Sequence, residues 1–541
     1  MQLRGLSRFG LIICFLFSSL LNAQSDFKVP SVGDAALADE YFSAANYIDA
    51  LKNYLALLKK DPLNDKYNYK AGLCYLYSNI NRSKSLTYLE LAAKADKVDN
   101  DLWFYLGKAY HLNYKFDDAI KAFQKFKKSG KGLAENRKQI DLYIDYCNNA
   151  KTLLKSPINV TFANLGKNVN SSAPEYQAFV PEDESFLVYT SRRKDAGVPL
   201  LPNGQYAESI YISKITAGDF AKSKPIGPPV NTGDGDVEVV GLSSTGDVML
   251  LVYANEESFA DLFIAYADKK MNFKKAEKLD KNINSSAQEI AAALSSDGNT
   301  LYFSSNRPGG YGGTDLYFSH KLPNGTWALA QNMGPAINTA DDEDFPNISI
   351  DGQTFYFSSN GHNSMGGYDI FVANFDSTSG QWSGVKNFGY PINTPDDDMN
   401  LRLSASKKYG YISALRDGGL GDLDIYRVDF NSDEANSTLI KGVVTSADTT
   451  VHFDPNEVRI SVTNLQSNEL YGIYTPNSSN HYVMILPPGK FSIHAEVPGF
   501  NDLNENIVIQ SKIQNHPEIE KKLILMPKGG LKKAPLKKNS K

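Results

Sequence analysis

The feature that most constrains this chain is a segment that occurs twice with nearly the same pattern. Residues 295–319 read SSDGNTLYFSSNRPGGYGGTDLYFS, and residues 350–373 read IDGQTFYFSSNGHNSMGGYDIFVA. In each copy a polar turn leads into an alternating apolar run, then a glycine-rich loop, then a second alternating run, which predicts two antiparallel strands. A long segment that recurs within one chain predicts a structural unit that stacks against copies of itself.

The unit occurs five times between residues 157 and 430. Each copy begins with Asn followed by Ser, Thr or a similar polar residue, about every 55 residues, at Asn170, Asn231, Asn284, Asn338 and Asn393. An acidic or polar cluster and three strand patterns follow each Asn, and a fourth short strand precedes it. Four strands in a repeated unit predict the blade of a β-propeller, so we expect five blades, with six as the alternative. The S-x-D-G-x-x-L-Y-F and G-G-x-D-L-Y patterns resemble those of TolB-type, WD-repeat-like propellers.

The order of the strand patterns predicts how the ring closes. Residues 160–166 match residues 327–334, which form the outer strand of the third unit, yet no unit precedes them. The fifth unit ends at its third strand, near Phe430. We therefore expect the early strand to complete the last blade, which removes an open sheet edge.

Residues 35–156 have the three- and four-residue apolar spacing of helices, and glycine is scarce. A repeat of about 35 residues is clearest at Trp103, Leu106, Gly107, Tyr110, Ala119 and Phe123, and it resembles the tetratricopeptide repeat. A helix at residues 133–154 is expected to cap the open end. The concave groove of such repeats binds partners, and its candidate contact residues are Tyr67, Tyr69, Tyr105, Tyr110 and Tyr114. The alternative is that these tyrosines pack between helices.

A different β pattern occupies residues 439–526. The passage LPPGKFSIHAEVPGF at residues 486–500 resembles the carboxypeptidase regulatory-like β-sandwich, an accessory module without catalytic machinery. Residues 527–541 contain mainly Lys, Gly and Pro, which predicts a disordered basic tail. This tail is either plainly solvated or in contact with anionic envelope polymers.

Residues 1–23 have the pattern of a secretory signal, with Arg4 and Arg8 before an apolar core and Ala23 at the cleavage point. The core is too short to span a bilayer, and no later segment is long and apolar enough. We therefore expect an exported protein in the periplasm or at the periphery of the outer membrane, without a transmembrane span. The remaining cysteines, Cys74 and Cys147, are expected to be buried apolar side chains, with a disulfide as the alternative.

No known catalytic or cofactor-binding motif is present. The seven histidines are scattered without the spacing of zinc ligands, and no nucleophile elbow or phosphate-binding glycine loop occurs. We therefore expect no catalytic residue, no metal and no cofactor, and predict that the chain is not an enzyme. The formal net charge of −5 argues against nucleic acid as a partner.

Acidic residues follow the repeated Asn elements, in loops expected to meet at one end of the propeller channel. A rim of carboxylates there would suit a cation or a basic peptide. The alternative is that Asn and Asp fix their own turns by bonding backbone, as is also expected of Asp315, Asp369 and Asp424 before the third strands. The candidate rim consists of Asp234, Asp236, Glu289, Asp341, Asp342, Glu343, Asp344, Asp396, Asp397 and Asp398.

The order of signal, helical repeats, propeller and sandwich resembles a multidomain family of Gram-negative envelope proteins. Its members carry an OmpA-like domain and are linked to type IX secretion and gliding, whereas this chain ends where that domain would begin. The resemblance implies a non-enzymatic envelope scaffold that binds proteins through the groove and the propeller face. The alternative is recognition of glycan or peptidoglycan by the propeller and the sandwich.

Overall fold

The computed structural model describes residues 27–530, apart from 196, 217, 234, 255–258, 405–408, 417, 431–437, 466–469, 477–479, 488 and 510–518. The predicted signal at residues 1–23 and most of the predicted tail lie outside the described residues. The chain divides into two compact units: residues 1–158 with 162–429, and residues 159–161 with 430–541. No helix in the described part is both long enough and apolar enough to cross a membrane.

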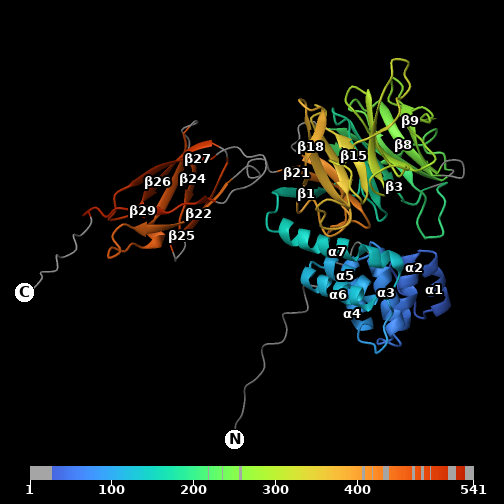
Figure 1. Ribbon diagram of the computed structural model, residues 1–541, viewed down its shortest axis with the longest axis horizontal. Coiled ribbons are helices and arrows are strands. Elements are labelled where there is room, and N and C mark those ends of the chain that lie inside the picture. Colours follow the sequence, from blue (N-terminus) through green and yellow to red (C-terminus); the bar gives the residue numbers. More distant parts are fainter. Residues whose placement is uncertain are drawn as a thin grey trace, which may run out of the picture. The chain divides into compact units, whose positions relative to one another are not determined.

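The first described element after the N-terminal segment is an array of helices (Figure 1). Side chains at the helix starts accept backbone N–H groups that have no partner within the helix: Asp34 accepts from Ala36 and Leu37, and Asn64 accepts from Tyr67. The seven α-helices of the described chain are α1 (Ala35–Ser43), α2 (Tyr47–Leu58), α3 (Asp65–Tyr77), α4 (Ser85–Ala92), α5 (Leu102–Leu112), α6 (Phe116–Ser129) and α7 (Ala134–Leu153).

Each helix packs against the next one in the chain. Phe104, Phe123 and Phe126 are almost fully buried between α5, α6 and α7. Burial of each such side chain contributes about 1.5–3 kcal/mol. Both cysteines are free and buried, so the disulfide alternative is not found. The helical pattern predicted for residues 35–156 is confirmed, while the tetratricopeptide assignment stays a prediction.

A β-propeller follows the helices, and its blades are five antiparallel sheets among the described residues. In the first four, successive strands pair in chain order, as alternating apolar runs joined by tight turns require, except that β6 pairs with β4. Their strands are β2 (Glu175–Phe179), β3 (Phe186–Ser191), β4 (Ser209–Thr216), β5 (Asp219–Phe220) and β6 (Lys224–Pro225); β7 (Asp236–Leu242), β8 (Val248–Ala254), β9 (Phe259–Tyr266) and β10 (Glu277–Lys278); β11 (Glu289–Leu294), β12 (Thr300–Ser305), β13 (Asp315–His320) and β14 (Gln331–Asn332); β15 (Glu343–Ile348), β16 (Thr354–Ser359), β17 (Asp369–Asp376) and β18 (Gln381–Asn387).

The fifth sheet closes the ring with a strand from the other end of the domain. Its order is β1-β21-β20-β19, where β1 (Val160–Asn164) precedes all other strands and β19 (Met399–Leu403), β20 (Tyr409–Ala414) and β21 (Asp424–Phe430) come last. The Asn164 amide donates to Asp424 at 2.7 Å, and the Leu165 N–H donates to the Ile425 carbonyl at 3.2 Å. The early strand thus completes the last blade, as the sequence match predicted.

Apolar side chains of neighbouring blades share their cores. Leu301 and Phe303 of β12 lie in one cluster with residues of β8 and β9, while Phe355 and Phe357 of β16 pack with Leu316 of β13. Because each sheet buries one face against each neighbour, the strands have little of the polar alternation of a half-exposed sheet.

The glycine-rich loops exist because neighbouring blades approach closely at their ends. A Cβ added at Gly312 would lie 1.8 Å from the backbone oxygen of Asp341 in the next unit. At Gly366 it would lie 2.5 Å from the Thr394 oxygen, and at Gly421 it would lie 2.5 Å from the backbone of Ser172. A glycine at the equivalent position of three units therefore permits close contact at three blade junctions, including the one that closes the ring.

The C-terminal unit contains two sheets around one hydrophobic core that includes Ile440, Ile460 and Phe491. Alternate residues of β26 face this core, as expected for a strand with one buried face. One sheet contains β22 (Thr438–Ser446), β25 (His481–Leu486), β28 (Ile519–Glu520) and β29 (Leu523–Leu525), and the other contains β23 (Arg459–Asn464), β24 (Leu470–Tyr474), β26 (Gly489–Glu496) and β27 (Leu503–Ile509). The carboxypeptidase regulatory-like assignment stays a prediction.

We expect Gly366→Ala to lower the free energy of unfolding by about 1–3 kcal/mol, because the new methyl group must displace backbone at a blade junction. Urea unfolding followed by circular dichroism measures this change. Gly529→Ala is the control, because a Cβ there meets no atom within 4 Å. Equal stability of the two variants would contradict the close-approach explanation.

Candidate functional site

The repeated Asn joins each unit to the blade before it. The Asn338 side chain accepts the Leu316 N–H at 2.8 Å and donates to the Leu316 carbonyl at 2.9 Å. Asn170 forms the same pair of bonds with Ile425 of the last blade, at 2.9 Å each. The corresponding pairs in the other units are Asn231 with Ile210, Asn284 with Leu262, and Asn393 with Ile370.

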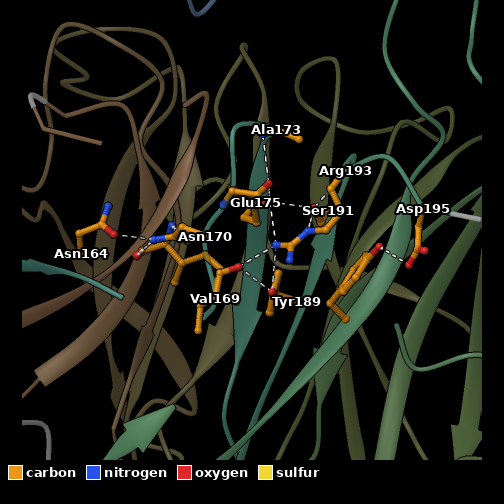
Figure 2. A network of polar contacts seen from close by, with 12 residues as sticks. Asn164, Val169, Asn170, Ala173, Glu175, Tyr189, Ser191, Arg193 and Asp195 are labelled. Atoms are coloured by element: carbon orange, nitrogen blue, oxygen red, sulfur yellow. Dashed lines mark hydrogen bonds and ion pairs between the residues drawn. The ribbon is translucent and has the colours of Figure 1, made fainter. Parts of the chain in front are cut away.

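A carboxylate five positions after the Asn fixes the following turn. In the first unit Glu175 accepts the Ser171 N–H at 2.8 Å and the Ser191 hydroxyl at 2.9 Å (Figure 2). Arg193 bridges this carboxylate, at 2.8 Å, to the Val169 carbonyl, at 2.7 Å. The carboxylates of Glu289, Glu343 and Asp398 accept from Ser285, Thr339 and Thr394 in the same way.

The fourth unit lacks the bridging arginine. Arg307 of the third unit donates to the Ile283 carbonyl and pairs with Glu289, whereas His362 of the fourth unit contacts the corresponding Ile337 carbonyl at 2.8 Å. Glu343 therefore has no cationic partner among the described residues. Burial raises the pKa of Glu343 to about 7, against the lowering effect of its hydrogen bonds.

The Asp before the third strand locks the glycine-rich loop. Asp315 accepts the N–H groups of Tyr311 and Gly312 and the Asn332 amide. Asp369 accepts the Met365 N–H and the Asn387 amide, and burial raises its pKa to about 8. The side chains act on their own turns, as the sequence predicted for this position.

The candidate rim lies at the end of the propeller where the inner strands begin, and its side chains mostly bind neighbouring loops. Asp342 accepts the N–H of Thr314, Asp397 accepts the N–H of Tyr368, and Asp236 accepts the N–H of Glu208. Asp344 is buried, which raises its pKa to about 6. Asp341 is partly buried, with its pKa raised by burial and then by Asp342. Asp234 lies outside the described residues.

The helices cover this same end of the propeller. Arg82 forms an ion pair with Asp396, and Asn79 donates to Asp422. His111 contacts the Met365 carbonyl at 2.8 Å. In addition, Tyr146 donates to the Asn360 carbonyl at 2.5 Å and Asn149 to the Ser364 carbonyl at 2.9 Å. Part of the rim is therefore occupied by the chain itself, and a role in binding other partners stays a prediction.

The candidate groove tyrosines contact other residues of the chain. The Tyr69 and Tyr105 rings lie 6.3 Å apart, and the Tyr69 hydroxyl donates to Asp99. Tyr110 donates to Glu90. Tyr67 packs near Tyr54 with ring centres 6.2 Å apart, and Tyr114, which is 45% exposed, packs edge-on near Tyr390 of the propeller. These contacts fit inter-helix and inter-domain packing, while ligand binding by the groove stays a prediction.

A cavity that the sequence reasoning missed lies at the opposite end of the ring, where the five inner strands end. Its volume is about 90 Å³, and an adjoining hollow of about 280 Å³ shares several lining residues with it. The polar side chains of the cavity belong to Glu182, Ser243, Ser244, Ser296, Asn347, Arg402 and Ser404.

Arg402 is the positive charge of this cavity. Its side chain is held between the Phe179 ring, 4.3 Å from the guanidinium carbon, and the Pro346 carbonyl, 3.1 Å from Nη1. At the corresponding position the other units have Phe179, Val240, Ala293 and Asn347. Comparison of the units position by position is the signal that would have identified Arg402 as the exception.

No family model and no curated protein matches the chain. Among solved structures it is similar to a glycoside hydrolase, with 10% identity and a TM-score of 0.35, covering 52% of this chain and 94% of that one. It is also similar to a GH43 β-xylosidase/α-arabinofuranosidase from a compost microbial metagenome, with 13% identity and a TM-score of 0.33 over 49% of this chain and 92% of that one. A third similar structure is an α-L-arabinanase of Penicillium chrysogenum, with 11% identity and a TM-score of 0.30 over 48% of this chain and 94% of that one. Similarity at this level does not bring an activity to this chain.

These matches contradict the prediction of a non-enzymatic protein-binding scaffold, because glycoside hydrolases recur among them. The prediction was wrong in its reasoning as well. It rested on missing zinc, serine-nucleophile and phosphate motifs, whereas glycoside hydrolysis commonly uses two carboxylates brought together by the fold, with no local sequence motif. The absence of such motifs therefore does not exclude an enzyme.

We expect Asn338→Ala to destabilise the ring, because a buried N–H left without a partner, as that of Leu316 would be, costs about 1–3 kcal/mol. The Leu316 carbonyl would keep the Met333 N–H as its donor. Chemical unfolding measures the loss. The control is Asn324→Ala, since Asn324 serves an exposed turn. A loss no greater than that of the control would show that the Asn link is dispensable.

Stability should fall as pH rises from about 4 to about 8 through the contribution of Glu343, Asp344 and Asp369. Their pKa values are raised in the folded chain, so in this interval the folded state binds more protons than the unfolded state. Urea midpoints at about pH 5 and about pH 8 test this effect. Glu343→Gln should flatten the dependence, and Glu277→Gln, at an exposed position of β10, should not. An unchanged slope in Glu343→Gln would refute the assignment.

Proposed function

We propose that the propeller binds a saccharide in the central cavity, at the end of the ring away from the helices. The observation that carries the proposal is the placement of this cavity. It lies where the five inner strands converge, and the chain's own helices contact the other end of the ring. Ligand sites in ring-shaped and barrel folds favour such converging strand ends.

The chemistry of the lining supports a sugar as the ligand. The Ser244 hydroxyl can both donate and accept. The Ser296 hydroxyl donates to the Ile350 carbonyl and can still accept, and the Asn347 amide donates one N–H to the Leu401 carbonyl and can still donate the other and accept. Sugar hydroxyl groups need the same combination of donors and acceptors. The cavity of about 90 Å³ opens to the adjoining hollow of about 280 Å³, and the two together give room for a sugar.

Cleavage of the bound saccharide is a second function that we propose to assay at the same site. Glu182 lines both the cavity and the hollow, and Asp351 lines the hollow. Glycoside hydrolysis requires a pair of carboxylates on either side of the bond that breaks. Glu182 and Asp351 are the two carboxylates that these linings offer.

The remaining assignments belong to the proposal as well. The pattern at residues 1–23 supports export to the cell envelope, where the glycan would be met. The helical repeats support a tetratricopeptide-like array over residues 35–156, and the C-terminal unit a regulatory-like sandwich over residues 439–526. Neither is assigned a catalytic role.

Ser244→Trp should abolish saccharide binding, because Ser244 lines the cavity and is only partly buried, so an indole there fills the space. Binding of the full chain to an array of plant, bacterial and cell-wall glycans is measured first, followed by calorimetry and product analysis with the glycans retained. Ser379→Trp, in the exposed turn after β17, is the control.

Absence of any retained glycan would overturn the proposal. Binding that survives in Ser244→Trp would place the site elsewhere. Product formation that is lost in Glu182→Gln would add catalysis to recognition.

A further inference from the structure

Arg402 is a buried cation without an anionic partner. Its side chain is 6% exposed, and within the described part of the chain no carboxylate lies within 4.0 Å of it. Among the described residues its only hydrogen bond is from Nη1 to the Pro346 carbonyl, and Nε has no partner there. By contrast, Arg193 and Arg307, which lie at two of the blade junctions, are paired with Glu175 and Glu289.

Such an arrangement is unfavourable unless something else compensates for it. Charged side chains are rarely buried unless they are paired, because removal of a charge from water is costly. Burial is the only cause that lowers the pKa of Arg402, to about 9, so the guanidinium is positive at neutral pH with no carboxylate to stabilise it. The stacked Phe179 ring offsets a small part of this cost.

We propose that the ligand of the central cavity is an acidic saccharide, a hexuronate whose carboxylate pairs with Arg402. The inference rests on the proposed saccharide site and specifies its ligand. A guanidinium presents donors in a planar fork that matches the two oxygens of a carboxylate, which gives both affinity and orientation.

The surroundings favour a carboxylate over a more highly charged group. Among the described residues that line the cavity one arginine is the only cation, and Glu182 adds a negative charge to the same lining. A doubly charged phosphate would therefore be poorly matched, whereas a single negative charge is balanced by Arg402. The serine hydroxyl groups around it suit the ring hydroxyl groups of the same sugar.

The direct test compares trimers of galacturonic acid with their methyl esters on the full chain by calorimetry. The two probes differ only in the charge of the carboxyl group. We expect the acid to bind at least about tenfold more tightly, as a charge-assisted bidentate pair implies. Acetate at the same concentration tests whether the site recognises a carboxylate without the sugar. We expect acetate to compete only weakly with the trimer.

Arg402→Met should remove the preference for the acid while leaving the thermal midpoint equal or higher, because replacement of a buried unpaired charge by an apolar side chain relieves its desolvation. Arg402→Lys keeps the charge without the fork and should retain only part of the preference. Arg427→Met, on β21 and paired with Asp429, is the matched control.

Each outcome decides between the two proposals. Equal binding of acid and ester by the natural chain would overturn the hexuronate inference and leave the saccharide site standing, and this comparison needs no variant. An unchanged preference in a folded Arg402→Met chain would also overturn it. If neither probe binds and no glycan on the array is retained, both proposals are overturned. If acetate binds as tightly as the trimer, the site binds an adventitious ion only, and the hexuronate inference is overturned.

Discussion

The propeller depends on one repeated interaction, the pair of hydrogen bonds between a buried Asn side chain and the backbone of the preceding blade. An amide side chain can accept and donate at once, so a single residue satisfies the N–H of a strand residue and adds a second donor to its carbonyl, which already accepts an N–H of the outer segment. The Asn338–Leu316 pair joins blades that are neighbours in sequence, and the Asn170–Ile425 pair joins the first unit to the last. Ring closure therefore uses the same chemistry as every other junction.

This interaction also decides what the carboxylates beside it do. The turn that follows four of the five Asn residues is held by Glu175, Glu289, Glu343 or Asp398, and these carboxylates are buried. Burial without full compensation raises several of their pKa values, so this end of the ring carries less negative charge than its composition suggests. The helices then contact the same loops. The acidic residues that follow the repeated Asn therefore serve mainly to hold blades and helices together.

The sequence predicted the features that repeat and missed those that do not. Regular Asn spacing and the unmatched early strand gave the propeller and its closure, because both depend on periodicity, which is visible without coordinates. The groove tyrosines and the rim were selected by residue type, and whether such residues face solvent or a neighbouring element depends on tertiary packing. Arg402 has an ordinary position within an inner strand, and only the convergence of five strands makes it the charge of a cavity. The prediction of a non-enzymatic scaffold rested on local motifs, and the carboxylate pair of a glycoside hydrolase leaves no such motif in a sequence.

The buried arginines of the ring differ in whether a carboxylate pairs with them. Arg193 and Arg307 each neutralise a buried carboxylate and bond a backbone carbonyl, so their burial is accounted for by the fold. Arg402 bonds a backbone carbonyl, but no carboxylate of the described residues forms an ion pair with it, and the units that lack it have apolar or neutral residues at the same position. Since those units close their blades without a charge there, the fold does not require Arg402. A charge that stability does not explain, in a cavity at the axis of the ring, is best explained by a ligand that brings the missing partner.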